Sequence, residues 1–288
     1  MKKIGFIDFY LDEWHANNYP AWIKESCAAN GYDMEVAYAW AETCRPGGMS
    51  TKAWCEAHGV GSLSSIEEVV EKSDCLIVLS PDNPEHHERL SALPLISGKP
   101  VYIDKTFSPD FAAGVRMFEL AEKHRTPMFS SSALRYAKEL SGYPDNRVNR
   151  ESIEYIMAMG PGVYDNYSVH QLEMIVSLAG TGAGRVKSLS TDNGRVLVIE
   201  YANGRLASMN QMQEAPFRLS IQLKDGGGVF VDQCSDIFQR LIDNILGFFE
   251  TGKSPVPREE TLEIMAIREA GYKALANYDT WIKIESLA

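Results

Sequence analysis

The sequence lacks the features that mark membrane-spanning, disulfide-rich and nucleic-acid-binding proteins. No run of apolar residues is long enough to span a bilayer, and the first residues lack a signal-peptide core and cleavage site. The five cysteines show no paired spacing of the kind that disulfide frameworks or zinc sites use. The formal net charge of −11 argues against a general affinity for nucleic acid or anionic membranes. We therefore expect a cytoplasmic protein with free thiols, no nucleic-acid partner, no membrane partner and no metal site.

Glycine is also missing from the turn after the first apolar segment. The segment Ile4–Phe9 has the pattern of a buried strand, and the residues after it lead into a helix. A dinucleotide-binding protein places a glycine-rich turn at this junction, whereas this chain has Asp8, Tyr10, Asp12 and Glu13 there. One carboxylate about 4 Å from a phosphate would cost about 4 kcal/mol at an effective dielectric near 20. The turn therefore predicts bulk and negative charge where a pyrophosphate normally binds.

The first ~130 residues alternate short apolar segments with helical patterns, and the composition is that of an ordinary globular protein. Strands are predicted at 3–9, 34–40, 75–80, 101–104 and 127–131, and helices at 19–30, 51–58, 65–72, 84–97 and 109–125. Alternation of strand and helix at this spacing is typical of a doubly wound parallel sheet with helices on both faces. Continuous apolar runs such as CLIVLS favour strands that are buried on both sides.

The pattern changes after about residue 150. Two hairpins are predicted, with turns at Asn203-Gly204 and at residues 225–228, and their strands alternate apolar and polar residues. Two helices follow, at 235–250 and 258–277. This half therefore reads as an α+β domain with a mainly antiparallel open sheet.

The predicted fold class is α/β with two domains. Residues 1–134 form a Rossmann-like dinucleotide-binding domain with a doubly wound parallel sheet, and residues 135–288 form the α+β domain for substrate binding and oligomerisation. A turn is expected at residues 142–145, near the boundary.

One apparent nucleotide motif is rejected on its context. The segment GFFETGKS, from Gly247 to Ser254, matches the phosphate-binding loop pattern letter for letter. That loop requires a strand before it and the start of a helix after it. Here the preceding residues have helical periodicity, and Pro255 and Pro257 follow. We therefore interpret the match as the end of a helix at Gly252.

Polar residues follow two neighbouring strands of the first half. Ser80-Pro81-Asp82-Asn83 comes after one strand and Asp104-Lys105-Thr106 after the next. In an open parallel sheet, ligands bind beyond the carboxyl ends of the strands. Lys105 has a close acidic neighbour in Asp104, which favours its charged form, so it could orient or protonate a substrate hydroxyl or carbonyl.

This stretch resembles the Gfo/Idh/MocA family, the relatives of glucose-fructose oxidoreductase and inositol dehydrogenase. Members show Asn-x-x-His, then Gly-Lys-x-Val, then Glu-Lys-Pro. The residues that match are Asn83, His86, Gly98, Lys99, Val101 and Lys105. Asp104 replaces the family's Glu and Thr106 its Pro. The later segment GPGVYDNYSVHQLEMIVSLAG is similar to the family segment that ends in an active-site histidine, here His170.

The resemblance implies an oxidoreductase that uses NAD or NADP and acts on a sugar, cyclitol or related polyol. It implies Lys105 and His170 as catalytic residues, since a neutral imidazole can accept the hydroxyl proton when a carbinol is oxidised. Substrate-binding candidates are Tyr164, Asp165, Asn166 and Tyr167, and Asn166 stands where members often carry an acid. Cofactor-binding candidates are Asp8, Phe9, Glu42, Pro81, Asn83, His86 and Asp104. We expect a homodimer or homotetramer.

The altered first turn leaves a second hypothesis open. The chain would then keep the fold and a sugar-like pocket but bind the dinucleotide weakly or not at all. It would be a binding or regulatory protein, or an enzyme without redox chemistry.

Overall fold

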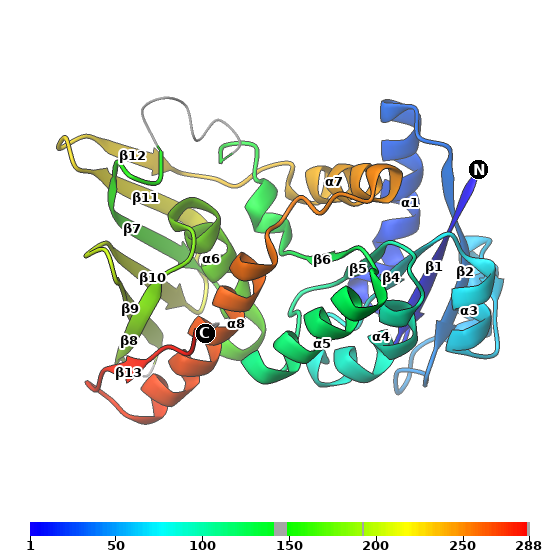
Figure 1. Ribbon diagram of the computed structural model, residues 1–288, viewed down its shortest axis with the longest axis horizontal. Helices are drawn as coiled ribbons and strands as arrows, with labels where there is room; N and C mark the ends of the chain where they lie inside the picture. The colour runs from blue at the N-terminus through cyan, green and yellow to red at the C-terminus, as the bar shows by residue number, and fades with distance from the viewer. Residues whose placement is uncertain (141–148, 192, 287–288) are drawn as a thin grey trace. The chain divides into compact units, whose positions relative to one another are not determined.

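The computed structural model describes residues 1–140, 149–191 and 193–286. The chain forms two compact units, one of Met1–Ser131 with Leu241–Pro257 and one of Ser132–Arg240 with Arg258–Ala288. Each unit has its own sheet. In Figure 1 the strands of the first sheet run from blue to green along the chain, and those of the second run from green to yellow, with its last strand in red. The turn predicted at 142–145 lies outside the described residues.

The first unit is built on a six-stranded sheet in the order β3-β2-β1-β4-β5-β6, in which every pair is parallel. Its strands are β1 (Lys2–Asp8), β2 (Met34–Ala41), β3 (Gly61–Ser62), β4 (Cys75–Val78), β5 (Val101–Ile103) and β6 (Met128–Ser130). Strands β4 and β5 are buried along their whole length, as continuous apolar runs predict. The predicted parallel, doubly wound sheet is confirmed.

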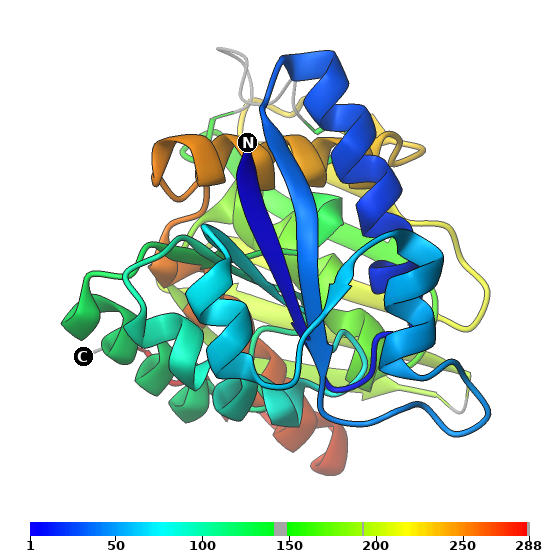
Figure 2. The same cartoon turned by 90° about the vertical axis from the view of Figure 1, so that its right-hand side faces the viewer.

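Helices cover both faces of this sheet (Figures 1 and 2). They are α1 (Trp14–Asn30), α2 (Thr51–His58), α3 (Ile66–Lys72), α4 (His87–Ile96), which follows a short 3-10 turn at Pro84–His86, and α5 (Phe111–His124). Helices α1 and α2 lie on one face, and α3, α4 and α5 lie on the other.

Helix α1 begins at Trp14, whereas the sequence predicted a start at residue 19. The difference arises because Pro20 usually marks the first turn of a helix but here lies inside it. The helix starts earlier because the Glu13 side chain accepts hydrogen bonds from two backbone N–H groups of its first turn. This early start brings His15 and Glu13 to the carboxyl edge of the sheet.

The second unit is built on a seven-stranded sheet in the order β12-β11-β7-β10-β9-β8-β13. Its strands are β7 (Ile153–Gly160), β8 (Ala183–Ser190), β9 (Gly194–Tyr201), β10 (Leu206–Met212), β11 (Arg218–Leu223), β12 (Gly228–Val231) and β13 (Ile282–Lys283). Over the described residues, β7 with β10 is the parallel pair and the others are antiparallel. Both predicted hairpins are confirmed, as β9–β10 and β11–β12.

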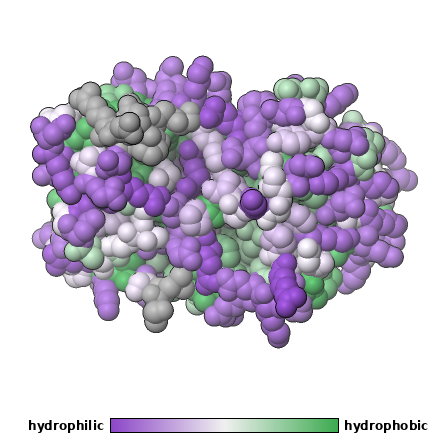
Figure 3. All heavy atoms as spheres, turned by 45° about the horizontal axis from the view of Figure 1, so that its top comes forward, coloured by the Kyte–Doolittle hydropathy of each residue, from purple (hydrophilic) through white to green (hydrophobic). Residues whose placement is uncertain are grey.

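Helices α6 (Tyr164–Ala179) and α8 (Arg258–Ala276) pack together and against this sheet. Alternate residues of the strands, such as Ile156 and Ala158 on β7, are buried, while Met157 between them is partly exposed. None of the helices in the described ranges is long and apolar enough to cross a membrane. The face drawn in Figure 3 is mostly hydrophilic, with hydrophobic residues in small groups.

Helix α7 (Ile237–Thr251) returns the chain to the first unit from Leu241 onward. There Asp243 accepts a hydrogen bond from Ser26 of α1, and Phe248 packs edge-on against Phe129 of β6. Gly252 ends the helix with a positive φ of 68°, and its N–H donates to the Phe248 carbonyl at 2.7 Å. The GFFETGKS segment is therefore a helix end, as its context predicted.

Candidate functional site

Three neighbouring strands of the first unit end at one edge of the sheet. Ile7 of β1 pairs with Val78 of β4, which pairs in turn with Ile103 of β5. The next residues, Asp8 and Asp104, are therefore brought to the same edge, although they are far apart in the sequence. Both carboxyl groups are buried.

Asp104 receives hydrogen bonds on both carboxylate oxygens. Its Oδ1 accepts from the Lys105 backbone N–H at 2.8 Å and from the Tyr102 hydroxyl at 3.3 Å. Its Oδ2 is bonded to Nδ1 of His15, on α1. Burial by itself raises the pKa of Asp104, but the positive charges of His15 and Lys105 and these hydrogen bonds outweigh it, so the pKa is lowered. Asp104 is therefore an ionised carboxylate at neutral pH.

The Lys105 side chain is held over the loop that follows β4. Its Nζ donates to the Pro81 carbonyl at 3.1 Å and lies 3.9 Å from Oδ1 of Asp82. Lys105 is only 7% exposed, so the ammonium group is fixed in position by these two residues. The structure thus brings together Lys105, Pro81 and Asp104, three of the residues singled out in the sequence.

Four other predicted cofactor residues lie in the loops beside this edge. The Phe9 ring packs on the His86 ring with the centroids 4.0 Å apart. Glu42, directly after β2, forms an ion pair with Arg89 of α4. Asn83 begins the turn before α4 and donates to Glu85 at 3.2 Å. None of these contacts joins the residues to the Asp104 carboxylate.

Glu13 lies at the end of the turn between β1 and α1, where its side chain caps the helix. Its Oε2 accepts from the His15 N–H at 2.7 Å, and its Oε1 accepts from the Ala16 N–H. Burial raises the pKa of Glu13 to about 7, although His15 and the two N–H donors oppose it. Burial and the charge of Glu13 raise the pKa of Asp8 well above its usual value. The negative charge predicted for this turn is therefore reduced at Asp8 and Glu13, whereas hydrogen bonds from Met49 and Asn17 lower the pKa of Asp12.

This turn does not fit a dinucleotide in the usual position. In that binding mode, glycines let the backbone approach the pyrophosphate, which accepts hydrogen bonds from the first N–H groups of the helix. In this chain residues 9–13 contain no glycine, and the two helix donors are bonded to Glu13. The acid after β2, Glu42, does suit a ribose hydroxyl. The residues present therefore fit the ribose but not the pyrophosphate.

In the second unit, His170 lies on α6 and bonds to Ser132. The distance from His170 Nδ1 to the Ser132 hydroxyl oxygen is 2.6 Å. The imidazole also packs edge-on against Tyr167 and Phe217, each with a centroid distance of 5.6 Å. Because a hydrogen bond to one ring nitrogen sets the orientation and tautomer of an imidazole, Ser132 fixes this side chain.

A buried charge network supports Ser132. One Glu173 oxygen accepts from the Ser132 N–H at 3.1 Å, and the other forms an ion pair with Arg135. Arg135 also pairs with Glu260 at 2.8 Å, and Glu260 with Arg150. Burial lowers the pKa of Arg135, but the two carboxylates outweigh this effect and raise it. The buried charges of Arg135, Glu173 and Glu260 are thus each paired with an opposite charge, as buried ions must be.

The four predicted substrate residues of α6 have different surroundings. Tyr164 is buried, and its hydroxyl donates to the Arg268 carbonyl at 2.9 Å, so it packs α6 against α8. Asp165 pairs with Arg268 at 3.0 Å. Asn166 is half-buried one helical turn before His170, and Tyr167 is exposed beside the imidazole. Asn166 and Tyr167 therefore remain candidates for substrate binding, whereas the buried Tyr164 side chain contributes to the packing of α6 against α8.

Sequence reasoning missed the partners that hold these groups in place: His15, Ser132, Arg135 and Glu173. Glu173 is three residues after His170, a spacing that puts both on one side of a helix, and this was the one signal available. His15 escaped notice because the start of α1 was predicted too late. The contacts of Ser132 and Arg135 are to residues distant in the sequence.

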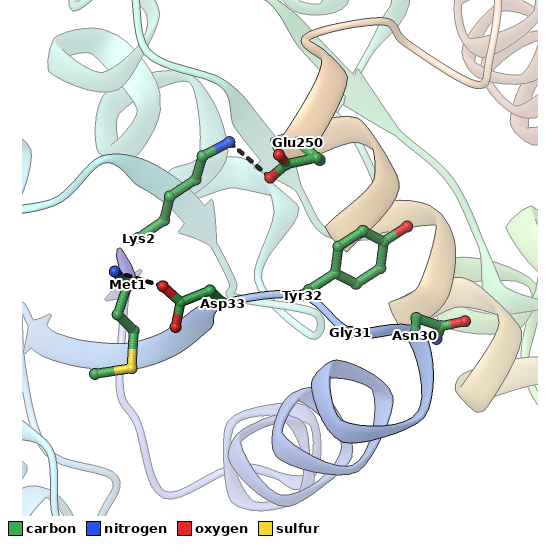
Figure 4. Close-up of a pocket in the computed structure, with 7 residues that line it drawn as sticks. All are labelled: Met1, Lys2, Asn30, Gly31, Tyr32, Asp33 and Glu250. Atoms are coloured by element: carbon green, nitrogen blue, oxygen red, sulfur yellow. Dashed lines mark hydrogen bonds and ion pairs between the residues drawn. The ribbon is translucent and has the colours of Figure 1, made fainter.

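A surface hollow of about 490 Å³ lies elsewhere in the first unit (Figure 4). It is lined by Met1, Lys2, Asn30, Gly31, Tyr32, Asp33 and Glu250. Two ion pairs cross it, from the Met1 amino group to Asp33 at 2.7 Å and from Lys2 to Glu250 at 2.8 Å. It lies at the amino ends of β1 and β2, the opposite edge from Asp104, so we do not assign a ligand to it. Within the described ranges, no three His, Cys, Asp or Glu side chains form a metal site.

Comparison with known proteins identifies the fold. No protein-family model and no curated protein matches the sequence. Solved structures match nearly the whole chain. Myo-inositol 2-dehydrogenase from Lactobacillus plantarum is 13% identical, with a TM-score of 0.77 and coverage of 99% of both chains. Scyllo-inositol dehydrogenase from Lactobacillus casei is 13% identical, with a TM-score of 0.79 and coverage of 98% of both chains.

The WlbA dehydrogenase from Bordetella pertussis, solved with NADH and UDP-GlcNAcA, is 15% identical, with a TM-score of 0.73 and coverage of 98% of both chains. The chain therefore has the two-domain fold of inositol and sugar dehydrogenases. The resemblance to the Gfo/Idh/MocA family is confirmed at the level of the fold.

Proposed function

We propose that the protein is an oxidoreductase that transfers a hydride to or from a sugar, cyclitol or related polyol, with NAD or NADP as the second substrate. The observation that carries this proposal is the fold, which matches polyol and sugar dehydrogenases over nearly the full chain. Two acid–base groups, Lys105 and His170, add to it because each is held by specific contacts in its own unit. The proposed site of action is the cytoplasm, which agrees with five cysteines that are all free thiols.

Lys105 and His170 have separate roles in the proposed reaction. When a carbinol is oxidised, the hydride leaves the carbon with its electron pair, and the hydroxyl proton must also leave. The His170 imidazole accepts this proton, since a neutral imidazole can act as a general base near neutral pH. The Lys105 ammonium, fixed by the Pro81 carbonyl, donates a hydrogen bond to a substrate oxygen and stabilises the charge that develops there. In the reverse direction His170 returns the proton.

NAD or NADP supplies the acceptor or donor of the hydride when it is bound. In this proposal Glu42 contacts a ribose hydroxyl, and the loops that carry Phe9, Pro81, Asn83 and His86 line the cofactor. Glu42 is already paired with Arg89, whose guanidinium is partly exposed. The choice between NAD and NADP therefore depends on whether that pair stays closed or Arg89 turns to a ribose phosphate.

The alternative hypothesis, a relative that binds a sugar-like ligand without redox chemistry, gains no support from the comparisons. The three solved structures named above are dehydrogenases, and one of them was solved with NADH. The observation that led to that hypothesis was the altered turn at Glu13. In the present proposal this turn affects how the dinucleotide binds, and not whether hydride is transferred.

Turnover by site variants tests the proposal. Screening polyols, cyclitols and nucleotide sugars with NAD and NADP should identify a substrate through the absorbance of reduced nicotinamide. Lys105→Ala and His170→Ala should then each lower kcat by about 10²–10⁴, the usual contribution of a general acid or base. Lys123→Ala and His124→Ala are matched controls, because both side chains are exposed on α5, and they should leave kcat unchanged. Normal turnover in either site variant would remove that residue from the mechanism.

A further inference from the structure

The Glu13 carboxylate occupies the place of an anionic ligand at the start of α1. It spans the two N–H groups of His15 and Ala16, one on each carboxylate oxygen. The side chain is buried, with only 4% of Glu13 exposed, and the helix that it caps is 17 residues long. Ser, Thr, Asp and Asn are the residues that usually cap helices, so a glutamate that caps with both oxygens is an uncommon choice.

Two further carboxyl groups lie near Glu13. On the β1 side lies Asp8, which is 1% exposed and whose Oδ2 has no hydrogen-bond partner among the described residues. On the β5 side lies Asp104, which is bonded to His15. His15 follows Glu13 by two residues and stacks on Tyr19, with the ring centroids 5.3 Å apart. A phosphate entering this region would meet three carboxyl groups, and the two helix donors nearest to it are already bonded.

We propose that Glu13 determines how tightly the protein binds dinucleotides, because its carboxylate takes the helix donors that a pyrophosphate uses in the usual binding mode. A dinucleotide then binds with its pyrophosphate displaced from α1, or only after Glu13 has left the two N–H groups. The consequence for NAD and NADP rests on the proposed function. The hydrogen bonds from the two helix N–H groups to Glu13 do not depend on it, because they are present in the structure whatever the activity is.

Removal of the carboxylate should create an anion site at α1. Glycine is a good helix cap, so Glu13→Gly removes the side chain at little cost to the helix and leaves the two N–H groups open. Glu13→Gln keeps the size of the side chain, removes its charge and leaves only one acceptor oxygen for the two donors. Asp12→Asn is the matched control. It removes one charge from the same turn, but Asp12 accepts from Met49 and Asn17 rather than from the helix donors.

The experiment measures the dissociation constants of inorganic pyrophosphate, ADP, NADH and NADPH by calorimetry for the wild type and the three variants. Backbone amide NMR signals of His15 and Ala16 report whether the anion reaches the helix. Glu13→Gly should bind pyrophosphate and ADP at least about tenfold more tightly than the wild type, with shifts at both amides, whereas Asp12→Asn should change affinity less than about threefold.

Equal affinities in Glu13→Gly and Asp12→Asn would overturn the inference, as would tight pyrophosphate binding at the His15 and Ala16 amides of the wild type. If Glu13→Gly does not fold, the same comparison is made with Glu13→Gln, with an expected gain of at least about fivefold. Pyrophosphate and ADP carry no nicotinamide. A gain with these probes in a protein that fails to transfer hydride would therefore support the inference and reject the proposed function.

Discussion

Three carboxyl groups of the first unit differ in protonation because their partners differ. Asp104 has His15, Lys105 and Tyr102 as donors or positive charges, and its pKa is lowered. Asp8 has negative neighbours and an unbonded oxygen among the described residues, and its pKa is raised. Glu13 lies between these cases, with a pKa of about 7. Burial acts on all three, so the specific contacts decide which group is charged.

The raised pKa of Glu13 predicts a pH dependence of stability. The folded protein holds the proton on Glu13 up to a pH of about 7, whereas the unfolded chain releases it near the ordinary value of 4.5. Between these values the folded state binds more protons, so the contribution of Glu13 to the free energy of unfolding falls as the pH rises. The loss is up to about 3 kcal/mol across this window, and the contribution is constant above it.

Urea unfolding of the wild type and Glu13→Gln at several pH values measures this effect. The free energy of unfolding of the wild type, taken relative to the variant, should decrease from pH 4.5 to 7 and then level off. Groups that do not interact with Glu13 titrate alike in the two proteins, so their contributions cancel in the difference. A difference that stays constant or increases over this range would show that the Glu13 pKa is not raised.

At the scale of single residues, the sequence indicates the acid–base groups better than their supports. Lys105 and His170 stand in recognisable motifs, and Asp104 follows a strand whose end is predictable. The contacts of Asp104 with His15 and of His170 with Ser132 join residues 89 and 38 positions apart. Such contacts depend on how strands and helices pack, which one sequence does not specify.

At the scale of elements, the buried strands of the first unit leave the clearest pattern. Strands β4 and β5 are short apolar runs between helices, so their parallel pairing follows from composition and spacing. The start of α1 is missed because a proline inside the helix looks like a beginning and a glutamate cap is unusual. The packing of α7 on the first sheet is not predictable from the sequence either. The pattern of an amphipathic helix shows that one face is buried, but not which sheet that face packs against.

The sheet of the second unit has an open face with apolar side chains. Its register places Met157 beside Ser208 and Ser220, with Val198 and Phe230 one strand further on each side. Met157 is 39% exposed and Phe230 77% exposed, whereas their strand neighbours on the other face are buried or less exposed. Helices α6 and α8 pack on the opposite face. An open apolar face of this kind favours contact with a second copy of the chain.

We expect the protein to form a homodimer or homotetramer through this face. Met157→Lys places a charge in the centre of the face and should shift the protein to a monomer in light scattering. Ile96→Lys is the matched control, because Ile96 is 42% exposed on α4 of the first unit, and this variant should keep the oligomer. A monomeric wild type, or an oligomer that Met157→Lys leaves intact, would contradict this role for the open face.

At the scale of the whole molecule, the fold extends further than the sequence likeness. The three dehydrogenases named above match 98% or more of the chain at 13–15% identity. Binary patterns of buried and exposed residues preserve an architecture through such divergence, because packing tolerates substitution where volume and pattern are kept. Function depends on particular sites. The altered turn at Glu13 is therefore the part of the molecule where the proposed activity can be tested most directly, because the dinucleotide would have to bind there.

Titration of the wild-type protein with NADH and NADPH tests the central claim most directly. Nicotinamide fluorescence and calorimetry together detect binding without knowledge of the polyol substrate. We predict saturable binding of at least one of the two at up to millimolar concentration, with one site per chain and with tighter binding by Glu13→Gly. The absence of binding by either cofactor at millimolar concentration, in both the wild type and Glu13→Gly, would contradict the proposal of a nicotinamide-dependent oxidoreductase.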